Sequence, residues 1–295
     1  MLGRRGRQSP INTMKTLVQQ ENAHKAWGLL GWSGVIAGVL ILSYYSVIAG
    51  WSLFYVLESV TGTLQGIDET QAGEIFSSLI ASPLTLIFWH TLFMAMTMFI
   101  VSRGVSNGLE AAVKYLMPAL AVLILVLIGY SILQGHFMLG VEFMFTPDFS
   151  KINQEAMGQA FFSLSLGMGA IMIYGSYLSQ KASITRTSFA VALMDTSVAI
   201  LAGLAIFPIV FAYQLEPAQG PGLIFNTLPL AFGQMSGGVI FGSLFFVLLV
   251  FAAWTSSISL IEPAVAWLVE RRGFTRVKAS MLCGGITWLV GLGTV

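Results

Sequence analysis

Long apolar stretches alternate with short polar ones along almost the whole chain. An α-helix needs about 20 residues to cross a bilayer, and most of these stretches reach or exceed that length. We therefore predict seven membrane-spanning helices, near residues 29–61, 84–102, 115–134, 157–178, 187–213, 237–269 and 279–295. The predicted fold class is an all-α membrane protein, a polytopic helical bundle that forms a single transmembrane domain over residues 1–295.

Composition agrees with this pattern. Hydrophobic residues make up 56% of the chain and charged residues only 9%, whereas a soluble domain has about 25% charged residues. A water-soluble fold is thereby excluded. The 14 Lys and Arg residues are nearly balanced by 13 Asp and Glu residues, so no basic surface for nucleic acid is expected. The single cysteine, Cys283, cannot form a disulfide within the chain.

The positions of the charges predict an orientation in the membrane. All Lys and Arg residues except Lys151 fall in the amino-terminal segment or in alternate loops, while the intervening loops are acidic. Because cytoplasmic loops carry an excess of Lys and Arg, we expect the amino-terminal end to be cytoplasmic, in a multi-pass protein of the plasma membrane. The segments 62–83 and 135–156 are then expected to be unusually long outer loops.

The fourth apolar stretch is interrupted near its middle. Residues 163–169 read Ser-Leu-Ser-Leu-Gly-Met-Gly; glycine weakens a helix, and a serine hydroxyl can bond the nearby backbone. Two interpretations stay open on these residues alone. The helix can unwind here to form a binding site, as discontinuous helices of secondary transporters do, or the small residues can allow close packing of neighbouring helices.

Several polar side chains are expected at membrane depth. Asp195 lies inside the fifth span, where a bare carboxylate costs on the order of 3 kcal/mol. It is either a ligand of a bound cation, since hard cations prefer oxygen ligands, or a protonated or hydrogen-bonded structural residue. The hydroxyls of residues 255–257 either bond their own helix or bind an ion. Glu262 either lines a water path or pairs with a neighbouring helix, and Tyr45 needs a hydrogen-bond partner.

Enzymatic motifs are not visible in the sequence. It has no HExxH, GxSxG or Walker motif, and we expect no enzyme activity.

Several segments together resemble the neurotransmitter:sodium symporter family, in the family's order and over essentially the whole chain. They are GRRGR at 3–7, SRGVSNGLE at 102–110, FMFTPDF at 143–149, FFSLSLGMGA at 161–170, GPGLIFNTLP at 220–229, SGG at 236–238 and FAAWTSSISLIEP at 251–263. The resemblance implies the family's five-plus-five inverted-repeat transporter fold with a broken helix near 163–169, of which the chain carries helices three to nine.

The resemblance also implies positions for the ligands. Ser163 and Asp195 would belong to a first sodium site, and the Ala252 carbonyl with the Thr255 and Ser256 hydroxyls to a second one. Gln159 resembles part of the outer gate. The substrate would contact Ile41, Tyr45, Phe162, Ser165, Met168, Ser256 and Leu260.

These residues imply sodium-coupled symport of a neutral, hydrophobic amino acid by alternating access. The fixed charge of Asp195, together with Ala199, which lacks a hydroxyl, implies that chloride is not required and that no other cofactor is used. The expected partners are the amino acid, Na⁺, the lipid bilayer and, as an assembly, a homodimer. The alternatives are another broken-helix cation-coupled transporter, or a truncated membrane fragment that does not transport.

Overall fold

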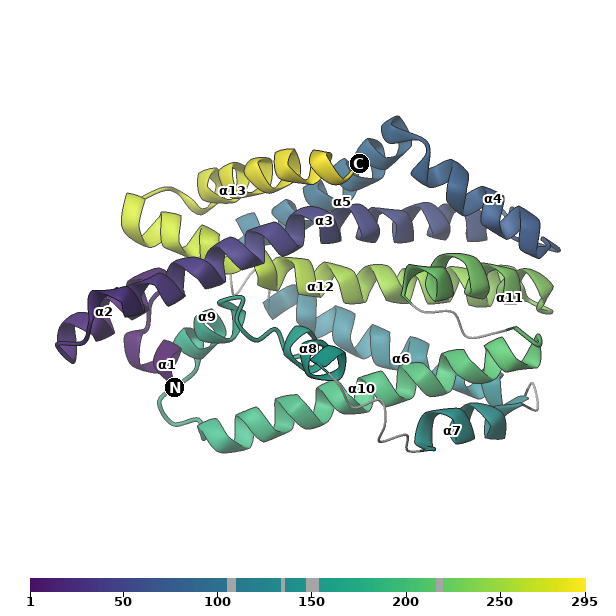
Figure 1. Ribbon diagram of the computed structural model, residues 1–295, viewed down its shortest axis with the longest axis horizontal. Helices are drawn as coiled ribbons and strands as arrows, with labels where there is room; N and C mark the ends of the chain where they lie inside the picture. Colours follow the sequence, from purple (N-terminus) through teal and green to yellow (C-terminus); the bar gives the residue numbers. More distant parts are fainter. Residues whose placement is uncertain (105–109, 134–135, 147–153, 216–219) are drawn as a thin grey trace.

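The structure is a computed structural model that describes residues 1–104, 110–133, 136–146, 154–215 and 220–295 (Figure 1). Over these residues it contains helices and no strand, which confirms the all-α fold class. Some predictions fall outside the described residues: the charges of Asp148, Lys151 and Glu216, residue 134 at the end of the third span, and parts of the 102–110 and 143–149 segments.

Six helices within the described ranges are long and apolar enough to cross a membrane. They are α3 (Leu29–Val60), α5 (Pro83–Ser102), α6 (Ala111–Leu133), α10 (Ile184–Ala212), α12 (Gly238–Arg272) and α13 (Arg276–Gly291). Hydroxyls inside these helices bond the preceding turn: Ser46 Oγ donates to the Leu42 carbonyl at 2.7 Å and Thr97 Oγ1 to that of Phe93 at 3.0 Å. These two hydroxyls are thus satisfied within their own helices.

The fourth predicted span, residues 157–178, is not one continuous helix. The chain forms α8 (Gln154–Ser163), leaves the helical path, and then forms α9 (Ala170–Tyr177). This span therefore consists of two short helices. The broken helix near 163–169, which the fold prediction included, is confirmed.

Shorter helices replace several segments that the hydropathy pattern left as loops or polar tails. In the expected outer loops lie α4 (Glu69–Ile80), which begins with a capping box between Asp68 and Gln71, and α7 (Phe137–Phe145). The others are α1 (Leu2–Gly6), α2 (Pro10–Gln20), the 3₁₀ helix Lys25–Gly28, the π-helix Leu223–Thr227 and α11 (Leu228–Gln234), while the 3₁₀ helix Leu292–Thr294 lies at the end of the last predicted span. The prediction of long outer loops at 62–83 and 135–156 did not include these helices, because helices shorter than a membrane span leave no long apolar run.

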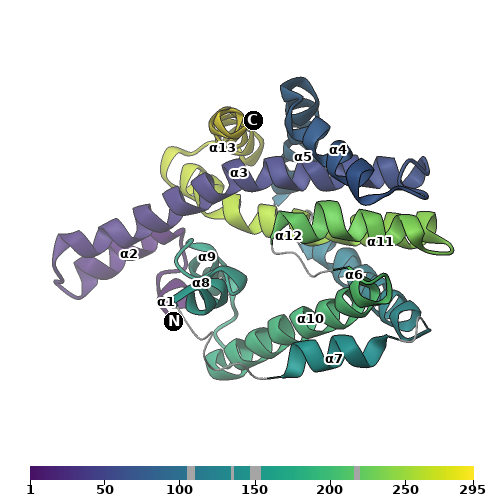
Figure 2. The same ribbon diagram turned by 45° about the vertical axis from the view of Figure 1, so that its right-hand side comes forward.

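The helices α3 and α12 lie side by side through the centre of the molecule (Figures 1 and 2). Helices α5 and α13 pack on one side of this pair. On the other side α6 contacts α12 and α10, and α10 contacts α7. At the α3–α12 contact Leu42, Ile258 and Ile261 are completely buried. The α3–α12 pair therefore forms the core against which the broken helix is placed.

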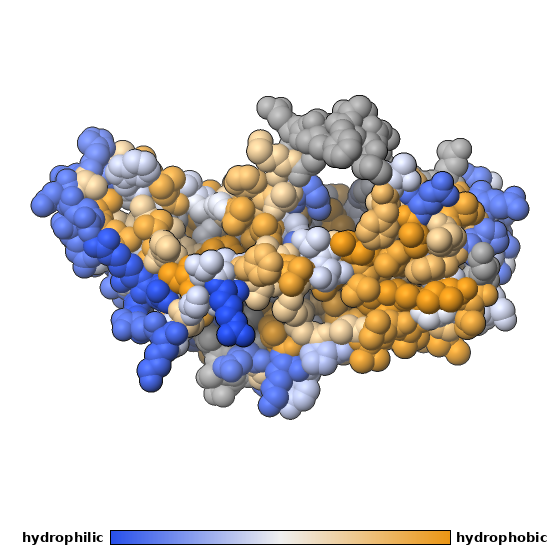
Figure 3. Space-filling view, turned by 90° about the horizontal axis from the view of Figure 1, so that it is seen from below, coloured by the Kyte–Doolittle hydropathy of each residue, from blue (hydrophilic) through white to orange (hydrophobic). Residues whose placement is uncertain are grey.

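The surface of the molecule has a large apolar region and a hydrophilic end. In Figure 3 apolar residues cover much of the face, while hydrophilic residues gather at the left end, which carries α1 and α2 in Figure 1. Large apolar side chains on α10 are exposed, among them Phe189 (71%) and Met194 (68%). Such a surface is stable in lipid and unstable in water, so the chain is a multi-pass membrane protein.

Candidate functional site

The break between α8 and α9 is made by three residues in the left-handed region of the backbone map. They are Ser165 (φ 54°), Gly167 (φ 82°) and Gly169 (φ 76°). Glycine adopts this conformation without steric cost, and a serine rarely does. Within the break, Leu166 N–H donates to the Phe161 carbonyl, five residues earlier, at 2.9 Å. Beyond it, backbone amides and carbonyls are released from the helix, which membrane proteins tolerate only inside protein or at an aqueous cavity.

Two glycines of α3 let the broken segment approach the core. A Cβ atom at Gly34 would lie 3.0 Å from the Gly169 nitrogen, and one at Gly38 would lie 2.7 Å from the Leu260 carbonyl oxygen and 3.3 Å from that of Met168. The sequence analysis missed these residues. Their spacing, four residues apart on one face of a predicted span, is a signal for close helix packing that could have identified them.

The two residues predicted for the first sodium site lie in direct contact. Ser163, the last residue of α8, donates a hydrogen bond from Oγ to Oδ2 of Asp195 on α10 at 2.6 Å. The Asp195 side chain is partly buried and that of Ser163 is exposed. The carboxylate therefore has a hydrogen-bond partner at the start of the break, and its oxygens stay able to bind a cation.

The residues predicted for the second sodium site lie next to one another on α12. Thr255 Oγ1 donates to the Ala252 carbonyl at 2.9 Å, and Ser257 Oγ donates to the Ala253 carbonyl at 2.8 Å. For these two hydroxyls the structure shows the bonding to their own helix that the sequence left as an alternative. The Thr255 hydroxyl keeps lone pairs while it donates, so it and the Ala252 carbonyl can both face one cation.

Four of the residues predicted to contact substrate belong to one packed cluster. Met168 and Leu260 are buried, and Ile41 and Tyr45 pack against the same core. The Tyr45 phenol lies close to the side chain of Ser256 on α12. Residues from α3, the break and α12 are thus brought together.

The other predicted residues lie farther out. Phe162 (43% exposed) and Gln159 are on α8 with their side chains at the surface. A cavity of about 500 Å³ lies beside the break, lined by Gly167 and Gly169 together with residues of α1 and α3. Of the predicted substrate contacts, all of which the structure describes, only Ser165 lines this cavity.

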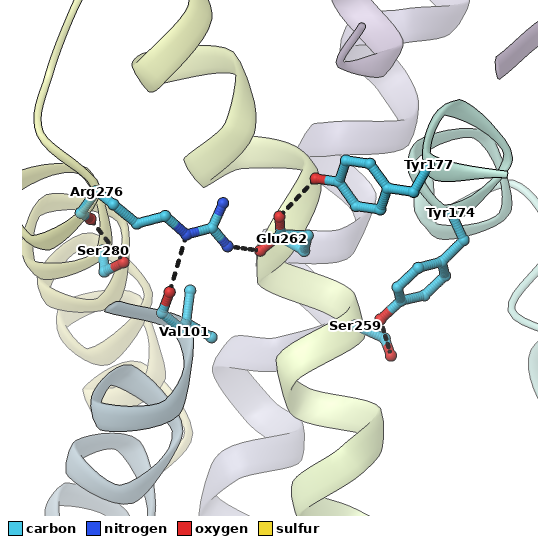
Figure 4. A network of polar contacts seen from close by, with 7 residues as sticks. All are labelled: Val101, Tyr174, Tyr177, Ser259, Glu262, Arg276 and Ser280. Carbon is cyan, nitrogen blue, oxygen red and sulfur yellow. Dashed lines mark hydrogen bonds and ion pairs between the residues drawn. The ribbon is translucent and has the colours of Figure 1, made fainter. Parts of the chain in front are cut away.

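Glu262 lies in the centre of a polar network (Figure 4). Its side chain is 1% exposed; it accepts a hydrogen bond from the Tyr177 hydroxyl at 2.7 Å and forms an ion pair with Arg276. Arg276 Nε also donates to the Val101 carbonyl at 3.0 Å. Of the two alternatives for Glu262, the structure shows pairing with neighbouring helices, here α9 and α13.

A second phenol joins α9 to α12 one turn away. Tyr174 and Ser259 are hydrogen-bonded at 2.6 Å, and Ser259 Oγ donates to the Thr255 carbonyl at 3.1 Å. Tyr174 and Tyr177 therefore attach α9 at two successive turns of α12, and the Tyr174 contact continues through Ser259 to the carbonyl of Thr255, a residue of the predicted second sodium site.

Comparison with known proteins gives the same family by sequence and by structure. The model of the Sodium:neurotransmitter symporter family matches residues 73–295. The chain is 38% identical to the uncharacterized sodium-dependent transporter YhdH of Bacillus subtilis and 34% identical to an uncharacterized sodium-dependent transporter of Haemophilus influenzae, each over 99% of the chain. It spans 65% and 66% of the length of these two relatives.

A solved structure is similar over the same extent. The crystal structure of MhsT in complex with L-phenylalanine matches with a TM-score of 0.89 and 41% sequence identity, over 99% of this chain and 67% of that one.

Proposed function

The chain belongs to the sodium:neurotransmitter symporter family, and we propose that it forms the part of a sodium-coupled symporter that holds one side of the ion and substrate sites. The substrate is a neutral, hydrophobic amino acid. The contact of Ser163 with Asp195 at 2.6 Å, at the beginning of the broken helix, is the observation that carries the proposal.

In the first sodium site, the Ser163 hydroxyl and the Asp195 carboxylate supply hard oxygen ligands. A carboxylate at membrane depth is expensive without a countercharge, and a cation with oxygen ligands offsets that cost. Because Asp195 is itself anionic and Ala199 offers no hydroxyl one turn away, the site needs no chloride to balance the sodium charge.

In the second sodium site, the Ala252 carbonyl and the hydroxyls of Thr255 and Ser256 are the ligands. Support comes from the 2.9 Å contact between Thr255 and Ala252, which places two of these oxygens side by side on α12.

The substrate lies between α3, the break and α12. Tyr45 and Ser256 would offer hydroxyls to the zwitterion, and Phe162 and Ser165 complete the contacts on the broken helix, with Gln159 at the outer gate. Ile41, Met168 and Leu260 surround the substrate side chain with apolar groups, which favours a hydrophobic amino acid over a charged one. MhsT, which is similar in fold and sequence, was solved with L-phenylalanine.

Transport would proceed by alternating access, as broken helices and half-helix dipoles allow. Ligands bind near the break, and movement of one group of helices against another opens the site to each side in turn. The distribution of Lys and Arg supports a plasma-membrane protein whose amino-terminal end faces the cytoplasm. We include a homodimer as the assembly to be tested.

Uptake into proteoliposomes tests the proposal. The chain is reconstituted, and uptake of L-phenylalanine and L-leucine is measured with external sodium and again with sodium replaced by potassium. Sodium-stimulated uptake, unchanged when gluconate replaces chloride, is expected. Equal uptake in sodium and potassium would contradict sodium coupling and favour another broken-helix cation-coupled transporter.

A second candidate is a membrane polypeptide that does not transport by itself. It is considered because the chain spans 65% and 66% of the length of two relatives. Binding of L-phenylalanine to the purified chain separates the two. Sodium-dependent binding without uptake supports the proposed ion and substrate sites and assigns the missing step to other segments. Neither binding nor uptake supports the second candidate.

A further inference from the structure

A cavity between α2 and the beginning of α3 lies outside the ion and substrate sites. It has a volume of about 390 Å³, and its apolar lining comes from Ile11 and Val18 of α2 and from Leu29 and Trp32 of α3. Two cations, Lys15 on α2 and Lys25 before α3, also line it. The cavity therefore combines a hydrocarbon surface with two ammonium groups.

Its position corresponds to the membrane surface. Helix α2 has 11 residues and is too short to span a bilayer; it buries Ile11, Met14 and Leu17 and exposes Lys15, so it is amphipathic. Helices of this kind lie in the interface between lipid and water. Two tryptophans, Trp27 (57% exposed) and Trp32 (42% exposed), flank the start of α3, and exposed tryptophans gather at the level of the lipid headgroups.

The walls of the cavity are fixed by contacts with the core. The Glu270 carboxylate accepts bonds of 2.9 Å from the Ser9 amide, at the beginning of α2, and from Asn12 Nδ2. On the opposite wall, Trp32 packs edge-on against Trp267 with ring centroids 5.0 Å apart. The cavity therefore needs little rearrangement to bind a ligand.

The charges around the cavity favour an anion. Its lining contains Lys15 and Lys25 and no Asp or Glu. The nearby acid Glu21 forms an ion pair with Arg5, and the Glu270 carboxylate accepts hydrogen bonds from the beginning of α2. Among the residues that the structure describes, no ion-pair partner is found for Lys15 or Lys25.

We propose that this cavity binds an anionic phospholipid of the adjacent leaflet, with the phosphate between Lys15 and Lys25 and an acyl chain against Val18, Leu29 and Trp32. A free phosphate would use the two lysines and leave the apolar lining unused. A zwitterionic lipid would use the lining and gain little from the lysines. An anionic phospholipid uses both, and it links α2 to the start of α3. The site depends on insertion in a membrane and is independent of sodium coupling.

Native mass spectrometry of the purified, delipidated full chain tests this site. Phosphatidylglycerol and phosphatidylcholine with the same acyl chains are added separately, and lipid retention is compared. The wild type should retain phosphatidylglycerol preferentially. Each lysine near a membrane surface contributes about fivefold to anionic-lipid affinity, so Lys15→Gln with Lys25→Gln should lower retention about 25-fold.

Two control double substitutions make the result specific: one removes two charges elsewhere, and one keeps the charges in the cavity. Lys114→Gln with Lys278→Gln removes the same charge from exposed positions on other helices and should retain the lipid, as should Lys15→Arg with Lys25→Arg. Equal retention of the two lipids by the wild type, or an equal loss in the Lys114 and Lys278 pair, would overturn the proposal. Displacement of the lipid by millimolar glycerol phosphate would also overturn it, because the headgroup alone would then account for binding.

Discussion

Replacing Glu262 with glutamine tests whether the buried ion pair holds α9, α12 and α13 together. The carboxylate is 1% exposed, whereas the Arg276 side chain is 23% exposed. Breaking a fully buried ion pair costs about 3–5 kcal/mol. Glutamine keeps an acceptor for the Tyr177 hydroxyl, and Arg276 keeps its 3.0 Å bond to the Val101 carbonyl and some contact with solvent. We therefore expect Glu262→Gln to lower the free energy of unfolding by about 2 kcal/mol.

The assay is a double-mutant cycle. Unfolding in mixed detergent micelles is measured for the wild type, Glu262→Gln, Arg276→Gln and the double variant. If the two side chains form the ion pair shown in Figure 4, the double variant is less destabilised than the sum of the single variants by about 1 kcal/mol or more. Additive effects would refute the reasoning, because the two residues would then act independently.

Two further predictions concern the broken helix and the second sodium site. Gly38→Ala places a Cβ 2.7 Å from the Leu260 carbonyl oxygen and 3.3 Å from that of Met168, so it should destabilise the protein by about 1–3 kcal/mol and weaken sodium-dependent binding of L-phenylalanine. Gly285→Ala on α13, where a Cβ meets nothing within 4 Å, is the control, and equal effects of the two would contradict the assigned packing. Thr255→Val should raise the sodium concentration needed for half-maximal binding about tenfold or more while thermal stability changes little; an unchanged sodium dependence would remove this hydroxyl from the site.

Hydropathy alone located the long helices because membrane length and apolar composition are local properties of the sequence. The break was also predictable: Ser165, Gly167 and Gly169 cluster within one span, and all three adopt positive φ. The short helices α4, α7 and α11 were missed because they are too short to produce a spanning apolar run. Their positions depend on packing against other segments, as when Gln234 Nε2 of α11 donates to the Ile67 carbonyl, just before α4, at 2.9 Å.

Contacts in the site join residues that are far apart in the sequence, and local sequence patterns do not predict such contacts. The partner of Asp195 is 32 residues away in sequence, and the Tyr177 contact of Glu262 joins residues 85 apart. The sequence identified Asp195 as needing a partner, on the cost of burying charge, and left Glu262 between lining a water path and pairing with a neighbouring helix. It identified Tyr45 in the same way, and the Ser256 side chain lies close to it. The sodium and substrate assignments stay predictions that rest on the family resemblance.

Binding of radioactive sodium to the purified chain is the most direct test of the central claim, that Ser163 and Asp195 hold a transported sodium ion. Retention of ²²Na⁺ is measured with and without L-phenylalanine, for the wild type, Asp195→Ala and Ser163→Ala. We predict that L-phenylalanine increases ²²Na⁺ retention by the wild type and that Asp195→Ala abolishes the increase, with a smaller loss for Ser163→Ala. Equal substrate-linked retention by the wild type and Asp195→Ala would contradict the account.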